Sequence, residues 1–415
     1  MTRTLFAGGV LFDGTGAPPA PADVVVEGGR ILDVGPGLDG DELIDCSGRS
    51  LLPGLFDCHV HVMSTTIDVL ANLATPFSYR FYQAAANLAA TLALGITTVR
   101  DAGGADLGVK QAAADGLIAA PRMQVALTIL SQTGGHGDTW QPCGGALPGS
   151  FVPHPGRPSN IVDGPDEVRR KVRQLVQMGA DVIKVCTSGG VLSARDDPRH
   201  AHFRDDELEV LVTEATAAHR PVMAHAQANE GIKAAVRTGV RSIEHGIYLD
   251  DEAIEMMLDR GTWLVPTLLA PQGVLAAAAA GLALTQAAKR KAAEVVDVHV
   301  DSFRRAVDAG VKVAMGTDCP VSPHGTNLDE LDLMERCSAM APTDALVAAT
   351  SSAAALLGLD DELGTVEPGK RADLVVVAGD PLDLPGLAKR VEQVWKDGQQ
   401  VVPLGPPAGP VTTRL

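Results

Sequence analysis

Leu51-Leu52-Pro53-Gly54-Leu55-Phe56-Asp57-Cys58-His59-Val60-His61 is an apolar run that ends in two histidines one residue apart. Its composition and its Pro-Gly start predict a buried strand. Residues i and i+2 of a strand point to the same face, so His59 and His61 can direct two imidazoles at one point. Two surface histidines on an alternating strand would give the same pattern, so the pair predicts a metal site only with support from elsewhere.

Between about residues 55 and 360, apolar strands alternate with amphipathic helices. The candidate strands are 54–61, 96–101, 122–129, 181–187, 221–226, 241–248, 262–268 and 311–317. Eight strands separated by helices predict an α/β fold of the closed (β/α)8 TIM barrel type. A doubly wound open sheet is the competing architecture on this pattern.

The two ends of the chain predict a second, smaller domain. Residues 4–50 carry short apolar runs split by turns, and Glu27-Gly28-Gly29-Arg30 is a hairpin signal. Strand-like runs return after Leu363, at 372–377 and 391–398. We therefore expect both ends to pair into one small β-sandwich outside the barrel. The expected division is 1–54 and 361–415 for the sandwich and 55–360 for the barrel.

Composition and charge narrow the classes of partner. The chain of 415 residues has 34 basic and 51 acidic residues, a net charge of −17. Nucleic acids and anionic membranes attract basic faces, so neither is expected as a partner. The six cysteines show no Cys-x-x-Cys spacing, and no signal-like or membrane-spanning apolar run is evident. We expect a cytoplasmic protein with reduced thiols.

If the chain forms a TIM barrel, its catalytic groups should follow the predicted strands, because catalytic groups of this fold lie at the carboxyl ends of the strands. Five predicted strands carry metal-compatible groups there, namely His59, His61, Lys184, His225, His245 and Asp318. Any one of them could be structural, since buried histidines are often satisfied core donors and strand-end aspartates often cap the next helix. Six together favour a metal site.

As a set, these motifs resemble the amidohydrolase superfamily, and the resemblance extends to the closing stretch from Gly364 to Leu374. It implies a hydrolase with a binuclear centre of divalent ions, most often zinc, although manganese and iron suit the same ligands. The implied ligands are His59, His61 and Asp318 on one ion, His225 and His245 on the other, and a carboxylated Lys184 between them.

Elementary chemistry gives reasons for two of these residue types. A desolvated strand lysine has a lowered pKa and can add carbon dioxide, and the resulting carbamate can hold two divalent ions that share a hydroxide. The alternative for Lys184 is a buried amine paired with a carboxylate. Asp318, next to the bridging hydroxide, can take its proton during attack and give it to the leaving amine. We expect Asp318 to be catalytic in this way.

Two long segments are expected to form the substrate pocket. Ser131 to Asp163 contains a Gly-Gly-His-Gly motif whose His136 could donate to a substrate carbonyl or carboxylate, and residues 188–203 follow strand four. Together they resemble the amidohydrolase subgroup of Xaa-Pro dipeptidases, arginine or lysine carboxypeptidases and ochratoxinase, which release a C-terminal amino acid from an amide. The candidate substrate contacts are His136, Arg195, Arg199, His202 and Gln227.

One position departs from that subgroup, whose members often carry Ala-Tyr after the strand-five histidine, whereas this chain has Ala226-Gln227. Glutamine can hydrogen-bond but offers no phenol. The expected substrates are dipeptides, N-acyl amino acids or ochratoxin A. The alternatives are ring amides, lactones or a deaminase substrate, although Lys184 counts against a deaminase and the filled ligand positions count against a non-enzymatic relative. The resemblance also implies a homo-oligomer.

Overall fold

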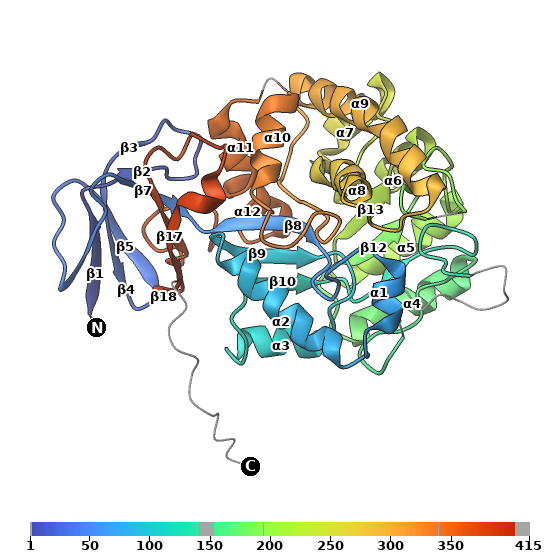
Figure 1. Cartoon of the computed structure of the whole chain (residues 1–415), viewed down its shortest axis with the longest axis horizontal. Helices are drawn as coiled ribbons and strands as arrows, with labels where there is room; N and C mark the ends of the chain where they lie inside the picture. The colour runs from blue at the N-terminus through green and yellow to red at the C-terminus, as the bar shows by residue number, and fades with distance from the viewer. Residues whose placement is uncertain (1, 141–152, 194, 339, 403–415) are drawn as a thin grey trace, which may run out of the picture.

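The computed structural model describes all residues except 1, 141–152, 194, 339 and 403–415. Parts of the segment from Ser131 to Asp163, of the segment 188–203 and of the C-terminal part of the sandwich therefore lie outside the described residues. Figure 1 shows a β-rich domain on the left, built from both ends of the chain, and a larger domain of strands and helices on the right.

The larger domain is built on parallel strands that alternate with helices, as the sequence predicts. Its strands are β8 (Leu55–Val60), β9 (Ile96–Asp101), β10 (Arg122–Val125), β11 (Ile129–Leu130), β12 (Ile183–Cys186), β13 (Val222–Ala226), β14 (Ser242–His245) and β15 (Trp263–Val265). They pair in the orders β10-β9-β8 and β11-β12-β13-β14-β15, all in parallel. The predicted third strand is thus split into β10 and β11, which pair with different neighbours.

Helices surround these strands in Figure 1. They are α1 (Val69–Ala74), α2 (Tyr79–Leu92), α3 (Leu107–Ala114), α4 (Pro165–Gln177), α5 (Asp205–Ala217), α6 (Asn229–Thr238), α7 (Asp251–Arg260), α8 (Leu269–Ala279), α9 (Gln286–Ala309), α10 (Asp329–Cys337), α11 (Pro342–Ala348) and α12 (Ser351–Leu357). Among the described residues, no helix combines the length and the apolar character that a bilayer span requires.

The predicted eighth strand, 311–317, is not a regular strand and makes a single isolated bridge, between Val313 and Leu264. Its backbone nevertheless bonds to both neighbours. Ala314 donates to the carbonyl of Leu264 in β15 at 3.0 Å, and Cys58 in β8 donates to the carbonyl of Met315 at 2.9 Å. The segment therefore links β15 to β8, as a TIM barrel requires.

The smaller domain is a sandwich of two sheets with the orders β5-β4-β1-β6 and β18-β17-β16-β7-β2-β3. The second sheet joins both ends of the chain, as predicted, and the expected hairpin at Gly28-Gly29 is confirmed between β4 and β5. The strands are β1 (Arg3–Ala7), β2 (Val10–Leu11), β3 (Ala20–Pro21), β4 (Asp23–Glu27), β5 (Arg30–Gly35), β6 (Glu42–Asp45), β7 (Arg49–Pro53), β16 (Leu374–Ala378), β17 (Val391–Lys396) and β18 (Gln399–Val402), with the 3-10 helix η1 (Leu387–Arg390) before β17.

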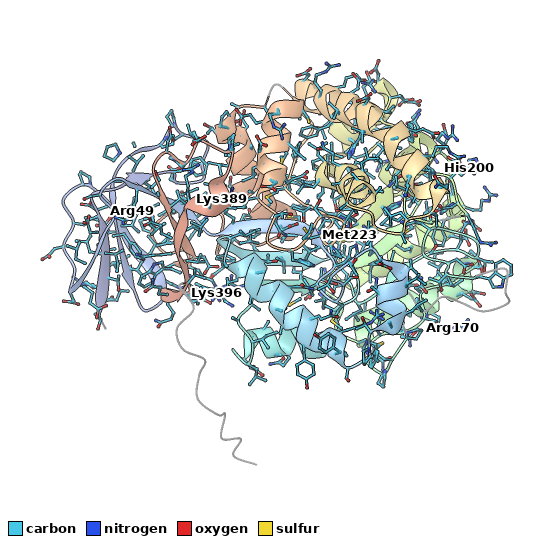
Figure 2. All side chains as sticks on the ribbon, in the orientation of Figure 1. Arg49, Arg170, His200, Met223, Lys389 and Lys396 are labelled. Carbon is cyan, nitrogen blue, oxygen red and sulfur yellow. The ribbon has the colours of Figure 1, made fainter. Side chains whose placement is uncertain are left out.

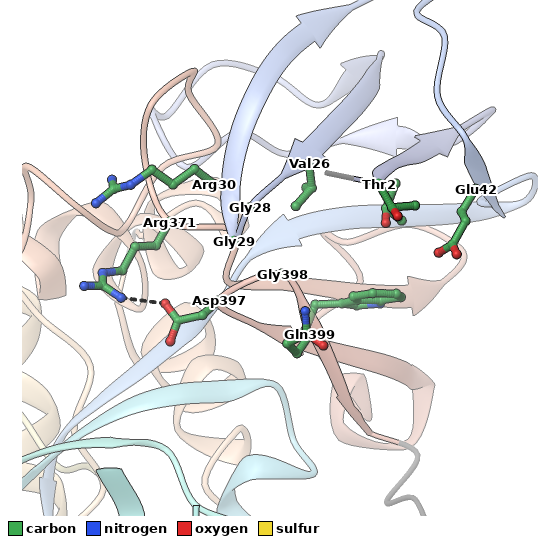
Figure 3. A pocket seen from close by; sticks show the side chains of 12 residues that line it. Thr2, Val26, Gly28, Gly29, Arg30, Glu42, Arg371, Asp397, Gly398 and Gln399 are labelled. Carbon is green, nitrogen blue, oxygen red and sulfur yellow. Dashed lines mark hydrogen bonds and ion pairs between the residues drawn. The ribbon is translucent and has the colours of Figure 1, made fainter. Parts of the chain in front are cut away.

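A cavity of about 610 Å³ opens in the sandwich, where Gly28 and Gly29 face the turn at Asp397 and Gly398 (Figure 3). An ion pair of 2.7 Å between Arg371 and Asp397 forms part of its wall. The cavity therefore belongs to the β-domain and not to the ends of the barrel strands.

The two domains meet at β7 and β8, which are separated by Gly54 alone. A Cβ atom at Gly54 would lie 2.2 Å from the hydroxyl of Thr97 in β9, so only glycine fits this joint. Arg122 of β10 reinforces the joint through ion pairs with Asp373 at 2.9 Å and Asp397 at 3.0 Å. Side chains fill both domains (Figure 2), and Met223 of β13 belongs to a small buried cluster. β8 is thereby held firmly with its histidine end in the barrel.

Candidate metal centre

The four strand-end histidines and Asp318 meet at one end of the barrel. The ring centroids of His59 lie 5.4 Å from His61 and 5.2 Å from His245, and His225 lies 4.6 Å from His245. One carboxylate oxygen of Asp318 lies 3.2 Å from Nε2 of His61 and 3.4 Å from Nε2 of His59. Donor atoms of His59, His245 and Asp318 all lie within 4.8 Å of one another, which is close enough to share a metal ion.

Each of the four rings has one nitrogen held by a neighbouring oxygen. The contacts are His59 Nδ1 to Glu244 at 2.7 Å, His61 Nδ1 to the carbonyl of Gly103 at 2.8 Å, His245 Nδ1 to the hydroxyl of Thr267 at 2.6 Å and His225 Nε2 to the carbonyl of Gly189 at 3.1 Å. Partners of this kind orient metal-binding histidines and select the nitrogen that coordinates. The arrangement leaves Nε2 of three rings and Nδ1 of His225 as the nitrogens that could bind a metal ion.

Glu244 and Arg100 complete this arrangement, and sequence reasoning missed both. Glu244 is fully buried and accepts a hydrogen bond of 3.0 Å from Arg100 in addition to its contact with His59. In a regular strand, Glu244 and His245 would point to opposite faces. The left-handed φ of +71° at His245 breaks this alternation, so both residues can reach the centre. The signal in the sequence was a charged residue within each of two apolar strands.

Lys184 lies in β12 with 1% of its surface exposed. Its amine has no hydrogen-bond partner among the described residues, so the alternative of an amine paired with a carboxylate does not hold there. Burial lowers the pKa of the Lys184 amine, which favours the neutral form. A buried neutral amine without a partner is what the addition of carbon dioxide requires.

Asp318 has an unusual backbone, with φ at +59°. Burial alone would raise the pKa of its carboxyl group, but the hydrogen bond with His61 and the charge of that imidazole, whose own pKa is raised, outweigh burial and lower the pKa. Asp57 fixes the same segment, because its carboxylate accepts hydrogen bonds from the backbone of His59 at 3.1 Å and from the hydroxyl of Thr317 at 2.7 Å. Asp318 is therefore an ionised carboxylate on a tightly held segment.

Three of the predicted substrate contacts lie around His225. The ring of His136 stacks on that of His225, with centroids 4.2 Å apart and an angle of 12° between the planes. His202 and Gln227 are 6% and 5% exposed. Nδ1 of His202 and Oε1 of Gln227 are buried and have no hydrogen-bond partner among the described residues, and contact of these two residues with a substrate stays a prediction.

The two predicted arginines lie farther out. Arg195 is exposed, and its guanidinium group lies 5.0 Å from the centre of the Trp140 ring. Arg199 pairs with Asp197 at 2.7 Å, and 62% of its side chain is exposed. Arg195 thus contacts a residue of the 131–163 segment and Arg199 a residue of its own loop, and contact between these arginines and a substrate stays a prediction.

Comparisons with known proteins agree with this geometry. The sequence profile described as "Amidohydrolase family" matches residues 50–402. Ochratoxinase from Aspergillus niger is 35% identical over 427 aligned positions, which cover 98% of this chain and 88% of the relative. The crystal structure of a Xaa-Pro dipeptidase with methionine bound in its active site has a TM-score of 0.88 at 34% identity and covers 96% of this chain and 99% of that one. The structure of A. niger ochratoxinase gives a TM-score of 0.85 at 33% identity, with coverage of 96% and 95%.

Proposed function

Because this chain belongs to the amidohydrolase family, we propose that it hydrolyses an amide bond with two divalent metal ions and releases the amino acid on the C-terminal side of that bond. One observation carries the proposal. Four histidines, each with one nitrogen held by an oxygen, surround a carboxylate and a buried lysine amine without a partner. This donor set fits divalent ions such as zinc.

We assign the candidate ligands to two metal ions and a bridging group. His59, His61 and Asp318 would hold one ion, His225 and His245 the other, and Lys184 would lie between them as a carbamate. Burial lowers the pKa of His59, His225 and His245 well below the ordinary value, so these rings are neutral, which is the form that binds metal. The bound ions would polarise the scissile carbonyl and lower the pKa of a water molecule.

Asp318 is the group that moves the proton. As an ionised carboxylate next to His59 and His61, it can accept a proton from the attacking water and return it to the nitrogen of the leaving amine. His136, which stacks on His225, would hold the substrate carbonyl in place with its ring Nε2. The chain's own residues thus supply both proton transfer and orientation.

The relatives support the substrate class. One is named an ochratoxinase and another a Xaa-Pro dipeptidase, and both names refer to substrates with an amide bond to an amino acid. His202 and Gln227, with their unpartnered buried atoms, are the residues we expect to contact the leaving amino acid or the acyl group. Dipeptides, N-acyl amino acids and ochratoxin A are therefore the substrates to examine first.

The test is amino-acid release from a panel of these substrates by metal-loaded protein, with chelator-treated protein as the control. We expect release that depends on metal, together with two metal ions per chain by elemental analysis. Two bound ions without release from any substrate would overturn the substrate class and direct the search to cyclic amides and lactones. Folded protein that binds no metal would overturn the centre itself.

A further inference from the structure

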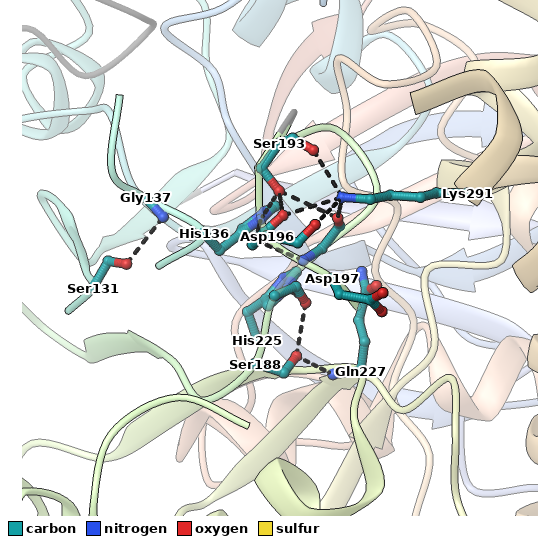
Figure 4. A network of polar contacts seen from close by, with 12 residues as sticks. Ser131, His136, Gly137, Ser188, Ser193, Asp196, Asp197, His225, Gln227 and Lys291 are labelled. Atoms are coloured by element: carbon teal, nitrogen blue, oxygen red, sulfur yellow. Dashed lines mark hydrogen bonds and ion pairs between the residues drawn. The ribbon is translucent and has the colours of Figure 1, made fainter. Parts of the chain in front are cut away.

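Lys291 is a buried cation that belongs to α9 and not to any barrel strand. Its side chain is 7% exposed, and its amine points into the β12 loop, defined here as residues 188–193 and 195–203 (Figure 4). The amine lies 3.0 Å from the carbonyl oxygen of Gly190, 2.8 Å from that of Ser193 and 3.2 Å from a carboxylate oxygen of Asp196. The backbone carbonyl of Asp196 lies 2.5 Å from the same amine. An ammonium group is costly to bury unless its N–H groups are satisfied, and these four oxygens supply an acceptor for each of the three.

Asp196 connects this cation to the candidate substrate contact His136. The Asp196 side chain is 2% exposed, with one oxygen near Lys291 and the other 3.1 Å from Nδ1 of His136. The second oxygen also accepts a hydrogen bond of 2.9 Å from the backbone of Gly190. The carboxylate therefore holds His136 by Nδ1 and leaves Nε2 of that ring to face a ligand.

The same loop also reaches the metal ligands. The carbonyl of Gly189 is the group that engages Nε2 of His225, and a Cβ atom at Gly190 would lie 2.2 Å from Cε1 of His136. The loop is therefore packed directly against the two stacked imidazoles (Figure 4). Because residues 188–193 form no helix or strand, their position depends on contacts of this kind.

We propose that Lys291 is a positioning residue: from α9 it holds the β12 loop so that Gly189 orients the metal ligand His225 and Asp196 orients His136. The inference rests on the proposed function, since both imidazoles belong to that site. A buried ion pair is weak evidence for stability, because its desolvation offsets much of its attraction. Its effect here is on geometry, because one cation holds three carbonyls and a carboxylate of an irregular loop around a single point.

The experiment compares Lys291→Met with a matched control, Lys233→Met. Lys233 is also largely buried, with 10% of its side chain exposed, but it pairs with Asp250 at 2.8 Å and Glu252 at 2.6 Å, outside the β12 loop. Loss of a positioning partner should lower kcat/KM about tenfold or more, mainly through kcat. Lys233→Met should stay within about twofold of the wild type, because its partners touch neither imidazole.

Two further readouts do not depend on activity. In Lys291→Met, hydrogen exchange of the loop amides should be faster and metal occupancy at limiting metal should be lower than in Lys233→Met. Equal exchange, occupancy and kcat/KM in the two variants would overturn the inference. If the wild type releases no amino acid from any substrate, the proposed function fails, whereas exchange and occupancy still decide the role of Lys291.

A double variant separates positioning from a general loss of stability. Lys291→Met leaves Asp196 buried without its cation, whereas Lys291→Met with Asp196→Asn removes both charges. The two single variants, Lys291→Met and Asp196→Asn, are measured beside the double variant. If the two residues act as one unit, kcat/KM of the double variant should match that of the worse single variant, and additive losses would contradict this. The double variant is also the test to use if Lys291→Met alone does not fold.

Discussion

Two buried lysines lie in very different surroundings, one in the interior of the barrel and the other at the loop that follows β12. Lys184, within β12, is 1% exposed, and its amine has no partner among the described residues. Lys291, which reaches the β12 loop from α9, is 6% exposed as a whole and has several oxygens around its amine. A buried polar group without a partner costs about 1–3 kcal/mol. The amine of Lys291 thus holds the β12 loop in place, whereas the amine of Lys184 stays without a partner among the described residues of the barrel.

The absence of a partner does not mark function by itself. The hydroxyls of Thr97 and Thr128 are also buried and have no partner within the described part of the chain. What sets Lys184 apart is its surroundings, since the charges of Glu244 and Asp318 act on its amine. The comparison therefore concerns a buried amine without a partner among metal-compatible donors, and each prediction below tests one part of it.

The largest effect is expected from Lys184→Ala. If the amine carries the carbamate that holds both ions, bound metal should fall well below two ions per chain and turnover should drop to background. Elemental analysis of purified protein and the amino-acid release assay measure the two quantities. Lys312→Met is the control, because Lys312 is an exposed lysine of the segment next to β15. Two ions retained in Lys184→Ala would remove the bridging role.

Asp318→Asn should come next, with turnover reduced by about 10²- to 10⁴-fold while metal remains bound. The amide that replaces the carboxylate can still contact His61 but cannot accept a proton. Turnover must be measured at matched metal occupancy, so that loss of chemistry is not confused with loss of metal. Near-normal turnover with both ions in place would show that another group moves the proton.

Glu244→Gln should have a smaller effect, because Glu244 acts through His59. Loss of its charge weakens the contact with His59 Nδ1 and leaves the buried Arg100 without its carboxylate. Changes to such partners of metal-binding histidines typically cost about 10- to 100-fold in metal affinity or activity. Competition with a chelating dye measures the affinity. Wild-type affinity in a folded variant would limit Glu244 to supporting Arg100 in the barrel interior.

The sequence was sufficient for the barrel, the sandwich and the positions of the candidate ligands. The reason is geometric, since the carboxyl ends of barrel strands converge, so groups such as His59 and His245 meet whatever the exact register. The resemblance to amidohydrolases, drawn from those same motifs, is confirmed by the profile match over residues 50–402. The identity of the metal and the carboxylation of Lys184 stay predictions.

Contacts between distant segments could not be predicted in the same way. The pairing of Arg100 with Glu244 depends on how β9 and β14 face each other across the barrel, and 95 residues separate Lys291 from Asp196. The irregularity of the segment 311–317 was likewise not evident from its apolar sequence. A Cβ atom at Gly316 would lie 2.4 Å from a methyl group of Val265, so only glycine fits beside β15 at this position.

The smallest predicted effect concerns His202 in the β12 loop and tests whether burial of an unpartnered atom has its expected consequence outside the barrel. Burial is the main cause that lowers the pKa of His202 from 6.5 to about 4. The unfolded chain therefore binds a proton more readily than the folded one below pH 6.5, so the stability that neutral His202 contributes is present above pH 6.5 and is lost as pH falls towards 4. Between pH 7 and pH 5 this amounts to about 1 kcal/mol in the free energy of unfolding.

Urea unfolding at pH 7 and pH 5 measures this loss of stability. The loss should be smaller by about 1 kcal/mol in His202→Gln than in the wild type. His200→Gln, at an exposed position in the same loop, should lose as much as the wild type. Equal losses in all three proteins would mean that the loop opens to water readily, and Lys291 would then hold it less firmly than its contacts suggest.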